Sequence, residues 1–266
     1  MQPLVLSSAD ITAWVGSFFW PLIRIASMFS IAPVIGGKQI PRRIRIAMAL
    51  LITLALMPLN QDMPLIDPLS ADGIYITAQQ VLIGLMMGFI LLLVFAAVTL
   101  AGENIAMSMG LGFAMASDPV NGVQVPVVSQ FLTIIASLLF LSMDGHLSLI
   151  SMMAQSFEAL PIGLHGISTN ALWSLLTWAK IMFNAAASIA LPAIISLLTV
   201  NLIMGIMTRA APQLNIFSVG FPMTMMAGYI ILLFSMPTLL SVFETMLQDA
   251  FSILTVILGG SEYGGI

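Results

Sequence analysis

Six apolar segments, separated by very few charges, decide what this chain can fold into. They cover residues 11–35, 44–57, 74–101, 126–143, 171–208 and 216–247. Across the sequence 60% of residues are hydrophobic, 7% are charged, and the mean hydropathy is +1.10. So few charges cannot cover the surface of a soluble domain of 266 residues. We therefore expect an all-α polytopic membrane protein.

The lengths of these segments do not match a bilayer. Residues 44–57 number 14, which as a helix cover about 21 Å of a hydrocarbon core about 30 Å thick. Residues 171–208 number 38, or about 57 Å as one helix. Pro192 is expected to kink or split that segment. Either the helices bend sharply at their prolines, or the folded protein does not lie flat in the bilayer.

The basic residues indicate how the chain is oriented across the membrane. Four of the seven lie within eight positions, in a loop that contains Lys38, Arg42, Arg43 and Arg45. The positive-inside rule places this loop in the cytoplasm and the N-terminus outside. No basic residue precedes the first apolar segment, so no cleaved signal peptide is expected. The absence of cysteine excludes disulfides and thiolate metal sites, and no cofactor is expected.

Several ionisable residues lie within or beside the apolar segments. Arg24 is the clearest case, since an arginine at the bilayer centre costs roughly 2.5–3.5 kcal/mol on insertion scales. Either it forms an ion pair, within the chain or with another subunit, or it snorkels along a tilted helix. Gly84 and Gly88 form a GxxxG face for close helix contact, and Gly220, Thr224 and Gly228 form a second small face. The residues proposed for buried ion pairing are Arg24, Glu103, Lys180, Arg209 and Glu244.

Residues 102–119 differ from the apolar segments on both sides. From Ala106 to Ala116 bulky residues alternate with small ones. A period of two favours an extended segment with one bulky face, and two glycines lower its helix propensity. A flexible segment rich in Met and Phe would form a soft seal. The alternative is a glycine-rich continuation of a packed membrane helix.

Catalytic motifs are missing from the sequence. It contains no HExxH, GxSxG, Walker A or GxGxxG. Asp144 and His146 are the nearest approach to a metal or catalytic pair, and they lie at an expected helix boundary. We therefore expect no enzyme. A polytopic solute transporter remains the alternative function, because Arg24, Glu103, Lys180, Asn184, Asn201 and Glu244 could line a polar path.

Several stretches carry a resemblance to a known family. They include FFWPLIRI (18–25), APVIGGKQIPRRIRI (32–46), FAMASDP (113–119), MDGHLSLI (143–150), LPIG (160–163) and, most specifically, NLIMGIMTRAAPQLNIFSVGFPMTMMAG (201–228). With these, the sequence resembles the FliR family of flagellar export-gate membrane proteins, whose equivalent in virulence type III secretion is SctT. The resemblance covers nearly the whole chain.

The resemblance implies a place in a larger assembly. It implies a helical hetero-oligomer with FliP and FliQ in the bacterial inner membrane, at the centre of the flagellar basal body, near FlhB and FlhA. Unfolded flagellar proteins would pass through its central pore. It also implies a FliP-like part over residues 1–166 fused to a FliQ-like helical hairpin over residues 167–266. Members of the family catalyse no reaction.

The resemblance also implies a role for the alternating stretch. In the family, a loop of the FliP-like part plugs the pore, and the matching positions here are Met107 to Met115. Bulky side chains in a narrow throat exclude water and ions, and flexible methionines adapt to varied substrates. The residues expected to form the plug are Met107, Met109, Gly110, Leu111, Gly112, Phe113 and Met115.

Overall fold

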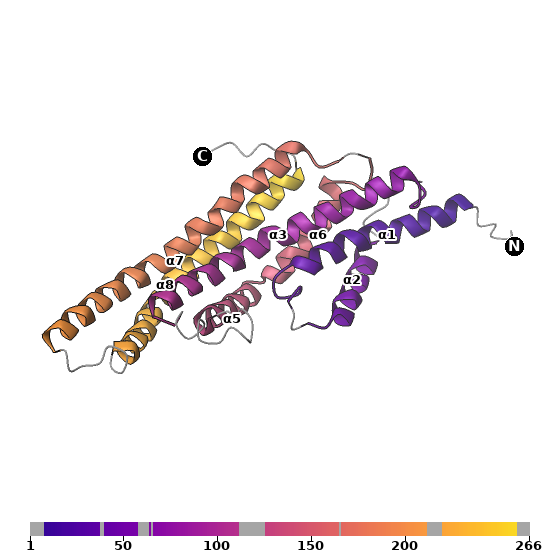
Figure 1. Ribbon diagram of the computed structural model, residues 1–266. Helices are drawn as coiled ribbons and strands as arrows, with labels where there is room; N and C mark the ends of the chain where they lie inside the picture. The colour runs from indigo at the N-terminus through magenta and orange to yellow at the C-terminus, as the bar shows by residue number, and fades with distance from the viewer. Residues whose placement is uncertain are drawn as a thin grey trace. The chain divides into compact units, whose positions relative to one another are not determined.

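The structure, a computed structural model, describes residues 8–37, 40–57, 64, 66–111, 126–164, 166–211 and 220–259. In these ranges there are seven helices and no strand (Figure 1). They are α1 (Ser8–Ile31), α2 (Arg42–Leu56), α3 (Ala71–Ser108), α5 (Val127–Ser142), α6 (Gly145–Ala159), α7 (Thr169–Ala210) and α8 (Phe221–Gly259). The expectation of an all-α chain is confirmed for the described residues.

Within the described ranges, three helices are long and apolar enough to cross a membrane: α3, α7 and α8, with 38, 42 and 39 residues. A fourth span results if α5 and α6 are counted as one bent segment. Asp144, between those two helices, has a left-handed backbone with φ of 55°. The sequence-based interpretation as a polytopic membrane protein agrees with these lengths and compositions.

Several helix ends differ from the expected bounds. Pro192 does not split α7, which is one helix of 42 residues with the proline inside it. One proline removes one backbone hydrogen bond, and the helix retains its other turns on both sides. α8 continues past Leu247 to Gly259, because Ala250, Ile253, Leu254 and Ile257 repeat at helical spacing and are all buried. α3 likewise continues past Ala101 to Ser108.

The chain divides into two compact units. Unit 1 comprises Met1–Leu92, Asp144–Ala179 and Ala250–Ile266, and unit 2 comprises Leu93–Met143 and Lys180–Asp249. This division follows packing, whereas the boundary expected at 166/167 concerns a fusion of two ancestral parts. The fusion therefore stays a prediction.

Within unit 1, α1 and α3 pack closely through the two glycines of the GxxxG face. A Cβ atom on Gly84 would overlap the carbonyl oxygen of Arg24, and one on Gly88 would lie 2.8 Å from the carbonyl oxygen of Met28. The close helix contact expected from Gly84 and Gly88 is confirmed. It sets Arg24, in the middle of α1, directly against α3.

Within unit 2, three aromatic rings form the centre of the core. The ring of Phe95 on α3 meets Phe140 on α5 and Phe243 on α8 edge to face, with centroids 5.8 and 5.6 Å apart. Beside them α3 and α5 approach closely at Gly102, where a Cβ atom would lie 2.6 Å from Cα of Ser129. The hydroxyl of Ser129 donates to the carbonyl oxygen of Thr99 at 2.6 Å. These contacts hold the second half of α3 in place.

Candidate functional site

The stretch expected to form a plug begins inside a helix. Met107 and Ser108 are the last residues of α3, and Met109, Gly110 and Leu111 form the turn that follows. The extended conformation expected from Ala106 onward is therefore wrong for residues 106–108. Alanine and methionine are good helix formers, so they prolong a helix already started upstream. Gly112, Phe113 and Met115 lie outside the described residues.

Gly110 ends α3 in a Schellman motif. The amide of Leu111 donates to the carbonyl oxygen of Ala106 at 3.1 Å, and the amide of Gly110 donates to that of Met107 at 3.0 Å. Gly110 has φ of +83°, in the left-handed region that this motif requires. The sequence predicted only a lowered helix propensity at this glycine, and in the structure Gly110 stops the helix at a defined residue.

The end of α3 packs on α8 inside unit 2. Met109 is completely buried, and a Cβ atom on Gly228 would lie 2.6 Å from its Cγ and Cε atoms. A Cβ atom on Gly110 would lie 3.5 Å from the ring of Phe221. Met107, two residues before Met109, is 64% exposed. The small face expected around Gly228 therefore receives the end of α3.

Arg24 is fully buried in unit 1, so it does not snorkel. Its Nε donates to Oε1 of Gln80 at 2.8 Å, and Nη1 donates to the carbonyl oxygen and the hydroxyl of Ser156 at 2.7 and 3.1 Å. Nη2 donates to the carbonyl oxygen of Leu160 at 2.9 Å, and the guanidinium carbon lies 4.3 Å from the ring centroid of Phe157.

These acceptors explain how a buried arginine is tolerated. Ser156 and Leu160 lie at the C-terminal end of α6, where carbonyl oxygens can accept a further donor and the helix dipole favours a cation. Among the described residues the acceptors of Arg24 are neutral oxygens rather than the expected carboxylate. Gln80 and Ser156 could not be identified from the sequence, because backbone and amide acceptors carry no charge pattern.

The other charged candidates are spread over the described chain. Lys180, Arg209 and Glu244 are exposed, and Glu103 is half-buried. Their pairing with other subunits stays a prediction. In the basic loop, Arg45 donates to the carbonyl oxygens of Gly36 and Gly37 at 2.7 and 3.0 Å. Arg42 and Arg43 are exposed, and Lys38 lies outside the described residues.

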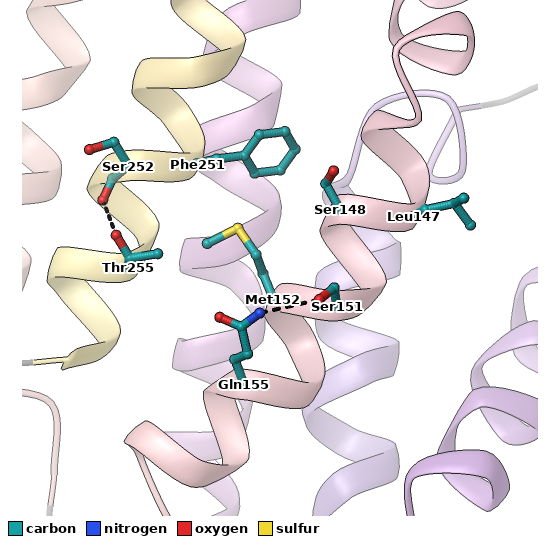
Figure 2. Close-up of a pocket in the computed structure, with 8 residues that line it drawn as sticks. All are labelled: Leu147, Ser148, Ser151, Met152, Gln155, Phe251, Ser252 and Thr255. Carbon is teal, nitrogen blue, oxygen red and sulfur yellow. Dashed lines mark hydrogen bonds between the residues drawn. The ribbon is translucent and has the colours of Figure 1, made fainter.

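Unit 1 also contains a groove of about 590 Å³ (Figure 2). It is lined by α6 residues Leu147, Ser148, Ser151, Met152 and Gln155 and by α8 residues Phe251, Ser252 and Thr255. The amide of Gln155 donates to the hydroxyl of Ser151 at 3.2 Å, and the Thr255 hydroxyl donates to the Ser252 carbonyl oxygen at 2.6 Å. None of the lining residues carries an acid, an imidazole or an amine.

The groove therefore lacks the groups that acid–base or metal catalysis requires. Within the described ranges, no three His, Cys, Asp or Glu residues gather as a metal site would need. His146, considered with Asp144 as a catalytic pair, has a buried Nδ1 atom without a hydrogen-bond partner in the described structure.

Three long apolar helices among the described residues define the class: this is a polytopic helical membrane protein. Comparison with known proteins gives the family. Residues 15–250 match the model described as "Bacterial export proteins, family 1". The chain belongs to this family of bacterial export proteins, which confirms the recognition made from the sequence.

The similar proteins are flagellar. The chain is 41% identical to the flagellar biosynthetic protein FliR of Pectobacterium carotovorum subsp. carotovorum over 258 residues, which is 96% of this chain and 97% of the relative. It is 36% identical to the FliR of Escherichia coli (strain K12) over 257 residues, with the same coverage. It is 29% identical to that of Bacillus subtilis (strain 168) over 241 residues, 89% of this chain and 91% of the relative.

Proposed function

We propose that this chain is the FliR-type subunit of a flagellar type III protein-export gate in the bacterial inner membrane. With FliP and FliQ it forms and seals the central pore of the basal body, through which unfolded flagellar proteins leave the cell. FlhB and FlhA are further partners. Near full-length similarity to flagellar relatives supports the export role. The chain contributes structure and gating rather than catalysis.

The exposed apolar surface of α7 and α8 is the observation that carries this proposal. In the most apolar stretch of each helix 22% of residues are buried, against 67% in α3. With 42 and 39 residues, these helices are about 63 and 59 Å long, roughly twice a bilayer core. Lipid covers only part of such a length. Partner subunits are needed for the remainder, as expected for one member of a hetero-oligomer.

The seal is assigned to the segment that begins at the end of α3. Met107 is 64% exposed and Leu111 half-buried. Phe113 and Met115 follow within four residues of Leu111. A ring of large apolar side chains excludes water from a narrow pore and so blocks ions. The thioether chain of Met107 has the freedom to close around substrates of different shape.

The test measures ion leakage with the complete complex in the membrane. We expect the triple variant Leu111→Ser, Phe113→Ser, Met115→Ser to make the inner membrane permeable to small ions while the complex still assembles. The matched control is Leu111→Met, Phe113→Leu, Met115→Leu, which keeps the apolar bulk and should stay tight. A tight membrane with the serine variant, at normal complex levels, would refute the seal.

A further inference from the structure

Two methionines at the end of α3 have opposite surroundings. Met107 is 64% exposed, whereas Met109 has no exposed surface. The difference follows from the helix, because residues two apart point to different sides and only residues three or four apart share a face. Met107 and Met109 therefore cannot have the same role, although both belong to the bulky positions of the alternating sequence.

Met109 occupies a notch that exists because residue 228 of α8 is glycine. A Cβ atom at Gly228 would lie 2.6 Å from Cγ and Cε of Met109 and 2.9 Å from its Sδ atom. Carbon atoms in contact normally stay about 3.5 Å or more apart. Any side chain at position 228 would therefore displace Met109, and no other residue type leaves this notch open.

Two further contacts hold the same helix end. The side-chain amide of Asn201 on α7 donates to the carbonyl oxygen of Ser108, with nitrogen and oxygen 3.4 Å apart. The backbone of Gly110 lies against the ring of Phe221, at the start of α8. α7 and α8 thus both contact the last residues of α3. The position at which the chain leaves α3 is fixed by its neighbours in unit 2 as well as by its own cap.

We infer that Met109 is a positioning residue, which seats the end of α3 in the notch at Gly228, and is not one of the side chains that seal the pore. The inference rests on the proposed function, since it divides the expected seal residues into two groups. Met107 and Leu111 belong to the sealing group. Met109 faces α8 and holds their starting point still.

Cysteine cross-linking tests the contact between Met109 and Gly228 independently of the proposed pore seal. The natural chain has no cysteine, so an introduced pair has no competing thiol in this subunit. Met109→Cys with Gly228→Cys lies within disulfide reach. The control pair is Met109→Cys with Met226→Cys, because Met226 is on the same helix but 64% exposed. In membranes that contain the complete complex, copper phenanthroline should oxidise the first pair and leave the control reduced.

If the control pair were oxidised as readily as the first pair, the inference that Met109 packs in the notch at Gly228 would be refuted. Cells with the oxidised first pair should also continue to export flagellar proteins, because a seat stays closed during transport. A block of export that dithiothreitol reverses would show that this contact must open, and would also overturn the inference. The disulfide result stands even if the serine variants show that the seal proposal fails.

A double substitution separates seating from sealing. Gly228→Ala places a methyl group against Met109 and is expected to raise ion leakage by displacing the end of α3. Adding Met109→Ala removes the displaced atoms, so leakage should fall in the double variant. If Met109 were a sealing side chain, its loss would instead add to the leak. Leakage in the double variant equal to or above that of Gly228→Ala, or no leak in Gly228→Ala, refutes the inference.

Discussion

Arg24 shows how one residue determines a local arrangement. Its guanidinium donates to oxygens on α3 and at the end of α6, so a single side chain joins three helices of unit 1. All of these acceptors are neutral. Without the guanidinium, the Ser156 carbonyl oxygen would retain the amide of Leu160 as a donor, whereas the side-chain oxygen of Gln80 and the carbonyl oxygen of Leu160 would each lose the donor described here. An unpaired buried acceptor costs about 1–3 kcal/mol.

We expect Arg24→Met to reduce the amount of folded complex severely, because it fills the space but removes the donor to the Gln80 side-chain oxygen and to the Leu160 carbonyl oxygen. Arg24→Lys should give an intermediate amount of folded complex, since the ammonium group of lysine reaches fewer of these acceptors than the planar guanidinium group of arginine. Fluorescence-detected size-exclusion chromatography of the tagged complex measures both. Equal yields for Arg24→Met and the unmodified chain would contradict this account of the residue.

At the scale of the element, the end of α3 depends on one backbone angle. Gly110 has φ of +83°, and a Cβ atom there would be in ordinary contact with Phe221 at 3.5 Å. Substitution therefore costs backbone energy rather than space. A left-handed conformation costs a residue with a side chain about 1–2 kcal/mol.

A graded series at this position should follow left-handed propensity. Gly110→Asn is expected to lower the melting temperature of the purified complex least, Gly110→Ala more, and Gly110→Val most, because asparagine tolerates this conformation and β-branched residues do not. Scanning fluorimetry provides the comparison. A ranking with valine as the mildest change would mean that the Schellman motif is absent from the assembled protein.

The elements also show what can be read from sequence. Long apolar runs predict six of the seven described helices, since each needs only local periodicity, whereas α6 lies in none of these runs. Close helix contact at Gly84 and Gly88 was also predicted, because small residues four apart mark close approach, but the sequence did not identify α1 as the helix in contact. Helix ends were predicted less well. The sequence from Ala106 to Ser108 fits both an extended segment with a period of two and a continuation of α3. The helix cap at Gly110 shows that the chain continues as a helix.

The candidate site was predicted only in part, for the same reason. The stretch around Met107 and Met109 stands out in the sequence, but their division into exposed and buried residues depends on a glycine more than a hundred residues away. Likewise the partners of Arg24 lie 56 and 132 positions away, and two of its acceptors are backbone carbonyls. Such contacts follow from the fold and leave no local signature.

For the whole molecule, the exposed apolar surface predicts dependence on partners. Phe234 and Leu233 on α8 are 79% and 70% exposed, and Leu198 on α7 is 66% exposed. We expect the chain to aggregate in mild detergent when it is produced alone, and to elute as one defined complex when FliP and FliQ of the same organism are produced with it. Size-exclusion chromatography with light scattering measures both. A monodisperse monomer from the chain alone would contradict the assembly.

The hydrogen bonds of Arg24 also set an order of events during synthesis. Its acceptors at Ser156 and Leu160 lie 132 and 136 positions later in the chain. When the ribosome has just produced α1, the carbonyls that will receive this guanidinium do not yet exist. The first helix to emerge is therefore among the last to reach its final place, and until then its cation must be kept hydrated.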